Sequence, residues 1–404
     1  MALVLAACSS RGSDSRGSGS AAPHPPMVND ARAVAIDAPA APADAPIPAT
    51  PSITGLLEMP AIKGNTDNLF GSGLALSATE LFIGESLAGH GRVHVYALDN
   101  GQWKKTATLQ PAKTDNFGAD VDVDGDTLAV SAVEDAQRGK SSGAVFIFER
   151  TDGAWKQTTK IVPPKNSYQF GWQLALSGNT LAVAAPWDGS DRGNVYVYER
   201  ADGAWKLKST LAAPAPAPKD LFGYDVAVLG DRIAVGTLHA KGAPKDSGAA
   251  YVFERGSDGW KLAATLKPDD AYARDAFGND VALVDDALIV SAPANHQGGF
   301  TGAVYVFRHQ ADGYHQTQKV QPLDSQTSDY YGDSISAYGD HVLVTALGSG
   351  EAWLYRYADG QLHGVDSVDG GRGFGATGAL GPDHAAFEMY GRIHGVATFA
   401  VERK

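Results

Sequence analysis

The sequence predicts an all-β fold, a seven-bladed β-propeller of four-stranded antiparallel blades. A phrase of an aromatic residue, a glycine and an alternating apolar run recurs seven times, at spacings of 47, 53, 52, 55, 54 and 43 residues. A period near 50 residues that contains only strand and turn signals is typical of propeller blades. The phrase begins at Phe70-Gly71, Phe117-Gly118, Phe170-Gly171, Phe222-Gly223, Phe277-Gly278, Tyr331-Gly332 and Phe374-Gly375.

Each repeat is predicted to contain four strands, as the third repeat illustrates. Its first strand lies around Leu174, ends at the turn Ser177-Gly178-Asn179, and is followed by the apolar run Thr180–Ala185. The third strand, Val195–Tyr198, is apolar throughout, and a strand of this kind is buried on both faces. A blade that lies between two other blades requires such a strand.

An Asn-Gly or Asp-Gly pair follows each third strand and predicts a two-residue type I′ hairpin turn. The fourth strand after it is mostly polar and often begins with an aromatic residue, so we expect it at the outer edge of the blade. The pairs are Asn100-Gly101, Asp152-Gly153, Asp202-Gly203, Asp258-Gly259, Asp312-Gly313 and Asp359-Gly360.

The two ends of the repeat region complement each other. The seventh repeat stops at Lys404 after its third strand, whereas residues 52–60 resemble a fourth strand without the other three. We therefore expect this N-terminal strand to complete blade seven beside Val396–Glu402 and to close the ring.

The first 52 residues predict export and a tether. Residues 1–8 resemble a truncated lipoprotein signal in which Leu5-Ala6-Ala7-Cys8 forms a lipobox, and Cys8 would carry the lipid. Residues 9–52 are rich in Ser and Gly and then in Ala and Pro, which predicts a disordered linker before the propeller at 53–404. We expect a bacterial envelope protein, anchored at the outer membrane or cell surface, whose natural start lies upstream.

Charge and cysteine content exclude several classes of protein. The net charge of −13 argues against a nucleic-acid partner, since such affinity comes mainly from Lys and Arg. A single cysteine excludes a disulfide framework. We expect a monomer.

The repeat resembles a known family. The Phe-Gly phrase, the pairs Ala185-Pro186 and Ala292-Pro293, and the following Gly-x-Val-Tyr-Val-Phe pattern are similar to the FG-GAP repeat of integrin α-subunit propellers. They are closer still to the bacterial version found in secreted and surface proteins. The resemblance implies a propeller across 53–404. Integrins carry calcium loops between the first two strands; here two-residue turns replace them, so we expect neither calcium nor another cofactor.

Two metal hypotheses were weighed on the residues themselves. Asp120–Gly125 resembles the start of a calcium loop, but its twelfth position is Ser131 rather than a carboxylate. We expect this segment to form an inner strand with Asp122 facing the central channel. His90, His239 and His296 lie in different blades, so we expect solvated loop histidines.

Candidate binding residues lie in the long, varied loops, which share one face of a propeller. No nucleophile elbow, Walker loop or dinucleotide fingerprint is present, so we expect no catalysis. Long loops on a rigid scaffold commonly carry binding sites, with aromatic and Arg residues as anchors. The candidates are Trp187, Asp188, Arg192, His239, Tyr272, Arg274, His296 and Phe300.

Three functions remain open at this stage. The favoured one is a binding or scaffolding module for an envelope or extracellular protein or glycan. An envelope assembly factor is an alternative that rests on analogy with anchored propellers. A propeller enzyme, a lyase or hydrolase, would show perturbed ionisable residues on the axis, whereas a binding module would show an apolar and aromatic patch on one face.

Overall fold

The computed structural model describes residues 53–64, 68–87, 90–112, 114–240, 247–295, 301–322, 329–371, 373–389 and 395–403. The predicted signal segment, the lipidation site Cys8 and the linker therefore lie outside the described residues, as do the candidates His296 and Phe300.

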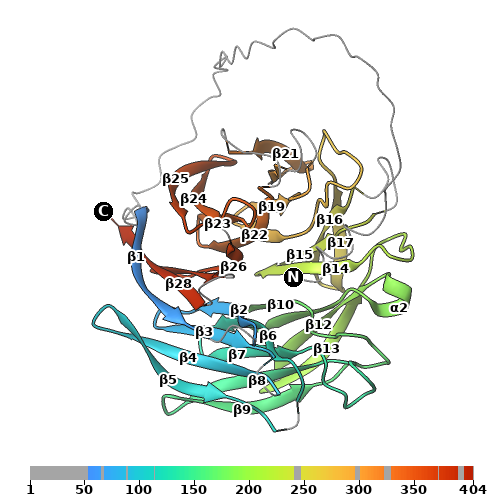
Figure 1. The fold of residues 1–404 in the computed structure, drawn as a ribbon. Coiled ribbons are helices and arrows are strands. Elements are labelled where there is room, and N and C mark those ends of the chain that lie inside the picture. Colours follow the sequence, from blue (N-terminus) through green and yellow to red (C-terminus); the bar gives the residue numbers. More distant parts are fainter. Residues whose placement is uncertain are drawn as a thin grey trace, which may run out of the picture. The chain divides into compact units, whose positions relative to one another are not determined.

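The predicted seven-bladed propeller is confirmed, since seven four-stranded antiparallel sheets follow one another along the chain. Figure 1 shows the first strands of the blades, such as β6, β14 and β22, around the centre of the ring. Blades one to three comprise β2 (Phe70–Leu76), β3 (Glu80–Glu85), β4 (Arg92–Asp99), β5 (Gln102–Leu109); β6 (Phe117–Asp124), β7 (Thr127–Ala132), β8 (Ala144–Thr151), β9 (Ala154–Ile161); β10 (Leu174–Ser177), β11 (Thr180–Ala185), β12 (Asn194–Ala201), β13 (Ala204–Leu211).

The remaining blades repeat this arrangement, with strand pairing in the order first, second, third, fourth. They comprise β14 (Phe222–Leu229), β15 (Arg232–Thr237), β16 (Ala249–Gly256), β17 (Gly259–Leu266); β18 (Val281–Val284), β19 (Ala287–Ser291), β20 (Val304–Gln310), β21 (Gly313–Val320); β22 (Tyr331–Tyr338), β23 (His341–Ala346), β24 (Glu351–Ala358), β25 (Gln361–Asp369); and β26 (Phe374–Leu380), β27 (His384–Met389), β28 (Gly395–Arg403), β1 (Ile53–Lys63).

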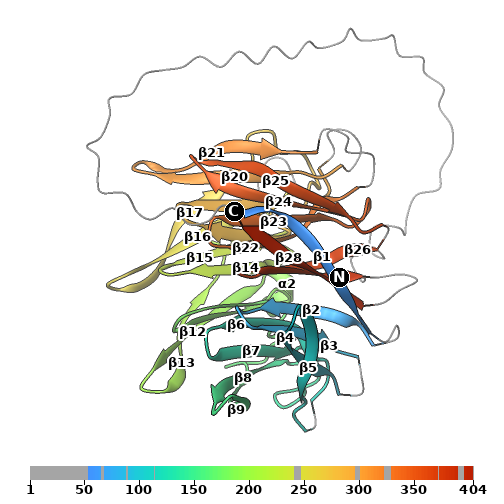
Figure 2. The same cartoon turned by 90° about the vertical axis from the view of Figure 1, so that its left-hand side faces the viewer.

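The ring closes as the sequence predicts, because β1 pairs antiparallel with β28 and supplies the fourth strand of blade seven. Leu56 lies opposite Val401, and the Leu56 backbone N–H also donates to Asp366 Oδ2 in blade six at 2.8 Å. Figures 1 and 2 both show β1 beside β28. The first and last described strands therefore belong to one sheet.

The core lies between neighbouring blades, and the aromatic residue of each phrase fills it. Phe117 is fully buried in a cluster with Phe82 and Val95 of blade one and Phe146 of its own blade. Its ring contacts Phe146 edge-on, with ring centroids 5.4 Å apart. The phrase therefore joins blades through apolar burial, the main favourable term in folding.

The glycine of the phrase permits the tight turn into the first strand. Gly171 has a φ of 92°, and Gln169, just before the aromatic residue, has a φ of 52°. An L-residue in this left-handed region is strained, whereas glycine is not. The residue preceding the aromatic adopts the same conformation in six repeats: Leu69, Asn116, Gln169, Leu221, Ala276 and Tyr330.

The hairpin prediction holds for four of the six Asn-Gly or Asp-Gly pairs. Asp152 and Gly153 have φ values of 54° and 76° and occupy the centre of a two-residue turn, as type I′ requires. For Asp258-Gly259 and Asp312-Gly313 the type I′ prediction is wrong. Gly256 pairs with Gly259, and Gln310 pairs with Gly313, so each glycine falls after the turn. The Asp-Gly pair is shifted by one position in these two repeats.

Candidate functional site

The long loops and the connections between blades lie on one face, opposite the two-residue hairpin turns. We call it the long-loop face, and it includes the described parts of 133–143, 162–173, 186–193, 212–221 and 267–280. We call the opposite side the short-turn face. Of the described candidates, Trp187, Asp188 and Arg192 lie on the loop 186–193 in blade three, and the others lie in or beside blade four.

Four aromatic rings form a continuous row on the long-loop face; we call them the aromatic row. Trp187 contacts Trp172 at 4.4 Å and Tyr168 at 6.4 Å between ring centroids, and Trp172 lies 6.1 Å from Tyr224. Tyr168 is 49% exposed, whereas Tyr224 is only 7% exposed. The row therefore runs from an open end at Tyr168 inwards to the start of the first strand of blade four.

Trp187 is followed by a strained turn. The short element α2 (Asp188–Asp191) is not a right-handed helix: Gly189, Ser190 and Asp191 have φ values of 64°, 65° and 62°. Left-handed geometry costs roughly 1–2 kcal/mol for each residue other than glycine. Strain of this kind persists only where surrounding contacts impose it, and it is common at functional sites.

The buried Asp188 carboxylate holds this turn in place through its hydrogen bonds. Asp188 is 3% exposed, and its Oδ2 accepts a hydrogen bond from the Tyr196 hydroxyl at 2.6 Å. Its Oδ1 accepts one from the Ser167 hydroxyl at 2.5 Å, which ties the loop to the connection that carries Tyr168. Asp188 thus fixes the loop that presents Trp187, while its own oxygens are occupied.

The other described candidates are spread over blade four and the connection to blade five. His239 is half-buried, and its backbone N–H donates to the Asp220 carbonyl at 3.2 Å. Tyr272 is 60% exposed, and Arg274 is exposed with a φ of 70°.

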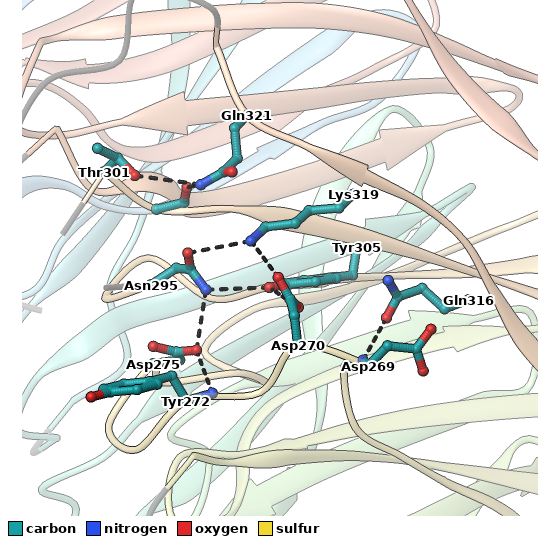
Figure 3. A network of polar contacts seen from close by, with 11 residues as sticks. Asp269, Asp270, Tyr272, Asp275, Asn295, Thr301, Tyr305, Gln316, Lys319 and Gln321 are labelled. Atoms are coloured by element: carbon teal, nitrogen blue, oxygen red, sulfur yellow. Dashed lines mark hydrogen bonds and ion pairs between the residues drawn. The ribbon is translucent and has the colours of Figure 1, made fainter. Parts of the chain in front are cut away.

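A buried polar network holds the connection that carries Tyr272 (Figure 3). Tyr272 N–H donates to Asp275 Oδ2 at 2.9 Å, and Asn295 Nδ2 donates to the same oxygen at 3.1 Å. Lys319 Nζ donates to Asp270 Oδ2 at 2.6 Å. Burial alone would raise the pKa of Asp270, but its hydrogen bonds with Lys319 and Tyr305 outweigh burial and lower it. The network fixes the connection that presents Tyr272 at the surface.

Carboxylates of the first strands line the axis and bridge neighbouring blades. Asp120 Oδ2 accepts a hydrogen bond from Leu174 N–H and Asp122 Oδ2 from Leu176 N–H, both at 2.6 Å. Burial raises the pKa of Asp120 and of Asp122 to about 7. The prediction that Asp122 lies on an inner strand is confirmed, and its carboxylate joins blade two to blade three.

The inner end of the aromatic row meets a second group of carboxyls. Burial raises the pKa values of Asp225 and Asp280, which also share a hydrogen bond between their side chains. Burial likewise raises the pKa of Asp333 to about 7, and Asp333 Oδ2 is buried without a hydrogen-bond partner. All three carboxyls lie close enough to Tyr224 to add to the rise that burial causes in its pKa.

Within the described residues, no group of three or more His, Asp, Glu or Cys side chains is arranged to hold a metal ion. No described helix has the length and apolar character needed to cross a membrane. The described side chains offer stacking on aromatic rings and hydrogen bonding to carboxyl, amide and hydroxyl groups.

Seven antiparallel blades with an aromatic row on the loop face define a β-propeller. Four segments, residues 103–148, 155–198, 205–253 and 260–307, match the FG-GAP repeat family. The protein is a seven-bladed β-propeller that contains four FG-GAP repeats. Each matched segment begins at the aromatic residue of a fourth strand and ends with the third strand of the next blade, so the sequence repeat is offset from the blade.

Solved structures show the same fold at low sequence identity. The WD40 domain of Toxoplasma gondii coronin superposes with a TM-score of 0.53 at 13% identity, covering 88% of each chain. A chain of a mitotic checkpoint complex gives 0.55 at 15% identity, covering 93% of this chain and all of its own. A putative 6-phosphogluconolactonase from Bacteroides fragilis gives 0.51 at 13%, covering 78% and 97%. No curated protein matches the sequence.

The sequence pattern indicates Trp187 as a candidate but does not indicate its three aromatic partners. Trp172 and Tyr224 occupy the second position after the aromatic residue of their phrases, where the other repeats carry Ser, Ala, Asn, Asp and Ala. Comparing this position across repeats would have singled out blades three and four. Tyr168 carries no such signal, because it lies in an irregular connection.

Proposed function

We propose that the protein is a binding module of the bacterial cell envelope that engages its partner through the long-loop face. The aromatic row is the observation that carries this proposal. Soluble proteins rarely leave several aromatic rings in contact at a surface without a use for them, and aromatic residues anchor interfaces. The strained turn beside Trp187 adds support, because strain is retained where a side chain must be held in place.

A matched pair of substitutions tests this face. Tyr338 lies on the short-turn face and is 49% exposed, as Tyr168 is. Partners captured from envelope extracts by the intact protein should be lost with Trp187→Ala and kept with Tyr338→Ala. Equal capture by both variants would remove the long-loop face from consideration.

Envelope anchoring is part of the proposal and rests on the sequence around Cys8. The protein exported by a bacterial host should carry a diacylglyceryl mass on Cys8. Cys8→Ser should release it from the membrane fraction. An N-terminal mass without lipid would refute the anchor while leaving the binding face untouched.

The axial carboxyls favour a second candidate, a propeller hydrolase or lyase. Asp225 and Asp280 form a hydrogen-bonded pair with raised pKa values, and paired carboxyls held at different protonation states are common catalytic groups. Incubation with neutral oligosaccharides, followed by mass spectrometry, would reveal cleavage products. Products that disappear with Asp280→Asn would support an enzyme; the absence of products would favour binding alone.

A further inference from the structure

The aromatic row presents ring surface at Tyr168, Trp187 and Trp172, whereas Tyr224 at its inner end is buried. Its contacts are edge-to-face or tilted, with interplanar angles of 89°, 86° and 47°, so no two rings in the row are stacked in parallel. Trp172 and Trp187 are both half-buried, and Tyr168 is open to solvent. Such rings present electron-rich faces, which attract C–H groups that carry a small positive charge.

Hydrogen-bonding groups surround the inner end of the row. Gln173, next to Trp172, donates through Nε2 to Asp225 Oδ1 at 3.0 Å, and Asn279 Nδ2 donates to the Asp333 carbonyl at 3.1 Å. Asp333 Oδ2 remains a buried acceptor without a donor. A buried polar atom without a partner is costly, and a ligand that donates a hydrogen bond there would remove the cost.

The charge at this end is smaller than the number of carboxyls suggests. Burial raises the pKa values of Asp225 and Asp280, and it raises the pKa of Asp333 to about 7, so these carboxyls hold protons more readily than exposed ones. A cation therefore gains less from this group than from three ionised carboxylates. An anion is disfavoured by the net charge of −13. A neutral ligand with many hydroxyl groups fits both conditions, since hydroxyls donate to and accept from carboxyls and amides.

From this geometry we infer that the aromatic row binds a neutral glycan. Sugar rings stack on Tyr168, Trp187 and Trp172, and hydroxyls reach the carboxyl and amide groups beside Tyr224. The inference rests on the proposed function and names the ligand of the same face. A protein partner with cationic side chains is the competing occupant.

Binding of hexasaccharides to the full chain tests this inference. The probes are the neutral cellohexaose, maltohexaose, laminarihexaose and N-acetylated chitohexaose, the fully deacetylated and cationic chitohexaose, and an anionic hexagalacturonate. Tryptophan fluorescence reports stacking on Trp172 and Trp187, and calorimetry gives Kd. At least one neutral hexamer should bind, and the acetylated chitohexaose should bind no more weakly than its cationic form.

Variants locate the site. Tyr168→Ala and Trp187→Ala should each raise the Kd of the neutral hexamer about tenfold. This change corresponds to the loss of one aromatic contact, roughly 1.4 kcal/mol of binding free energy. Tyr338→Ala, equally exposed on the short-turn face, should leave Kd unchanged. Tyr168 is a surface residue, so its variant should fold even if Trp187→Ala does not.

The inference would be overturned if no neutral hexamer bound at about 10 mM, a concentration at which a binding free energy of a few kcal/mol is detectable. Tighter binding of the cationic hexamer than of the neutral ones would also overturn it. So would equal effects of Tyr168→Ala and Tyr338→Ala on Kd. The proposed function would survive the first two if protein capture still depended on Trp187. It would fail only if neither glycan nor protein binding required the long-loop face.

Discussion

At the scale of single residues, a glycine before the third strand of blades one to five explains how tightly these blades pack against the next. A Cβ atom built on Gly248 would lie 1.9 Å from the Phe277 carbonyl oxygen of the next blade. The same approach occurs at Gly91, Gly143, Gly193 and Gly302, at 2.0–2.2 Å. The aromatic phrase of one blade therefore passes directly over the glycine of the blade before it.

Gly248→Ala should destabilise the protein by roughly 3 kcal/mol or more, because backbone would have to move to admit the methyl group. Gly203→Ala is the control. Its φ is 75°, but nothing lies within 4 Å of the added atom, so only backbone strain of about 1 kcal/mol is expected. Denaturant unfolding and the soluble yield measure both variants. Equal losses would show that the close approach is unimportant.

The candidate site shows what single residues reveal and what they hide. Trp187 is recognisable as an aromatic residue in a long loop, whereas Trp172 and Tyr224 resemble ordinary members of an inner strand. Asp188 was proposed as a ligand-binding residue, and the structure places it beneath the loop with its oxygens hydrogen-bonded. Whether a loop side chain points to the solvent or into the protein depends on the backbone torsion angles, and the residue type does not specify these angles.

At the scale of elements, charged and aromatic side chains connect third and fourth strands across blade junctions. Arg255 lies over the Trp260 ring at 4.8 Å and pairs with Glu199 of the preceding blade at 3.5 Å. Trp260 Nε1 donates to the same carboxylate at 3.2 Å. Arg150 and Trp155 make similar contacts to Glu80, which lies on the second strand of blade one.

Glu199→Ala should lower the free energy of unfolding by about 1–2 kcal/mol, since it leaves the Trp260 indole N–H without its acceptor and removes one of the two carboxylates paired with Arg255. Lys156→Ala removes an exposed pair with Asp152 and should be indistinguishable from the wild type. Chemical denaturation compares the two. A neutral result for Glu199→Ala would mean that water replaces the carboxylate at no cost.

Strand β1 is the element on which ring closure depends. A chain that starts at residue 53 should melt at the wild-type temperature, whereas a chain that starts at residue 64 exposes the edge of β28. Unpaired edges favour aggregation, so this shorter chain should melt lower or precipitate. A peptide of residues 53–63 should restore its melting temperature. Equal melting of both truncations would contradict a structural role for β1.

At the scale of the whole molecule, the axial carboxyls link stability to pH. The pKa values of Asp120, Asp122 and Asp333 in the folded protein are about 7, above the value of 3.8 that they have when unfolded. The folded state therefore binds protons more tightly. Their contribution to stability is complete below about pH 4 and is lost as the pH rises to 7.

The melting temperature should accordingly be higher at pH 6 than at pH 8, by on the order of 5 °C. Asp122→Asn keeps an oxygen to accept the Leu176 N–H but cannot ionise, so it should raise stability at pH 8 and reduce the pH dependence. Calorimetry at several pH values checks both. Burial lowers the pKa values of His94 and His384, so acidification below about pH 6 should act in the opposite direction.

The sequence by itself determined the seven repeats, their four strands and the closure of the ring by residues 53–60. These features follow from a local pattern that is repeated seven times. Because the sequence repeat begins at a fourth strand and ends in the third strand of the next blade, the first strand of the propeller must pair with the last. Only the tertiary structure decided which side chains meet. The aromatic row brings together the connection at Tyr168, the loop at Trp187 and the beginnings of the first strands of two blades. The carboxyls near Tyr224 come from three blades. Contacts between residues more than fifty positions apart depend on the radial arrangement of the blades, which no single repeat encodes.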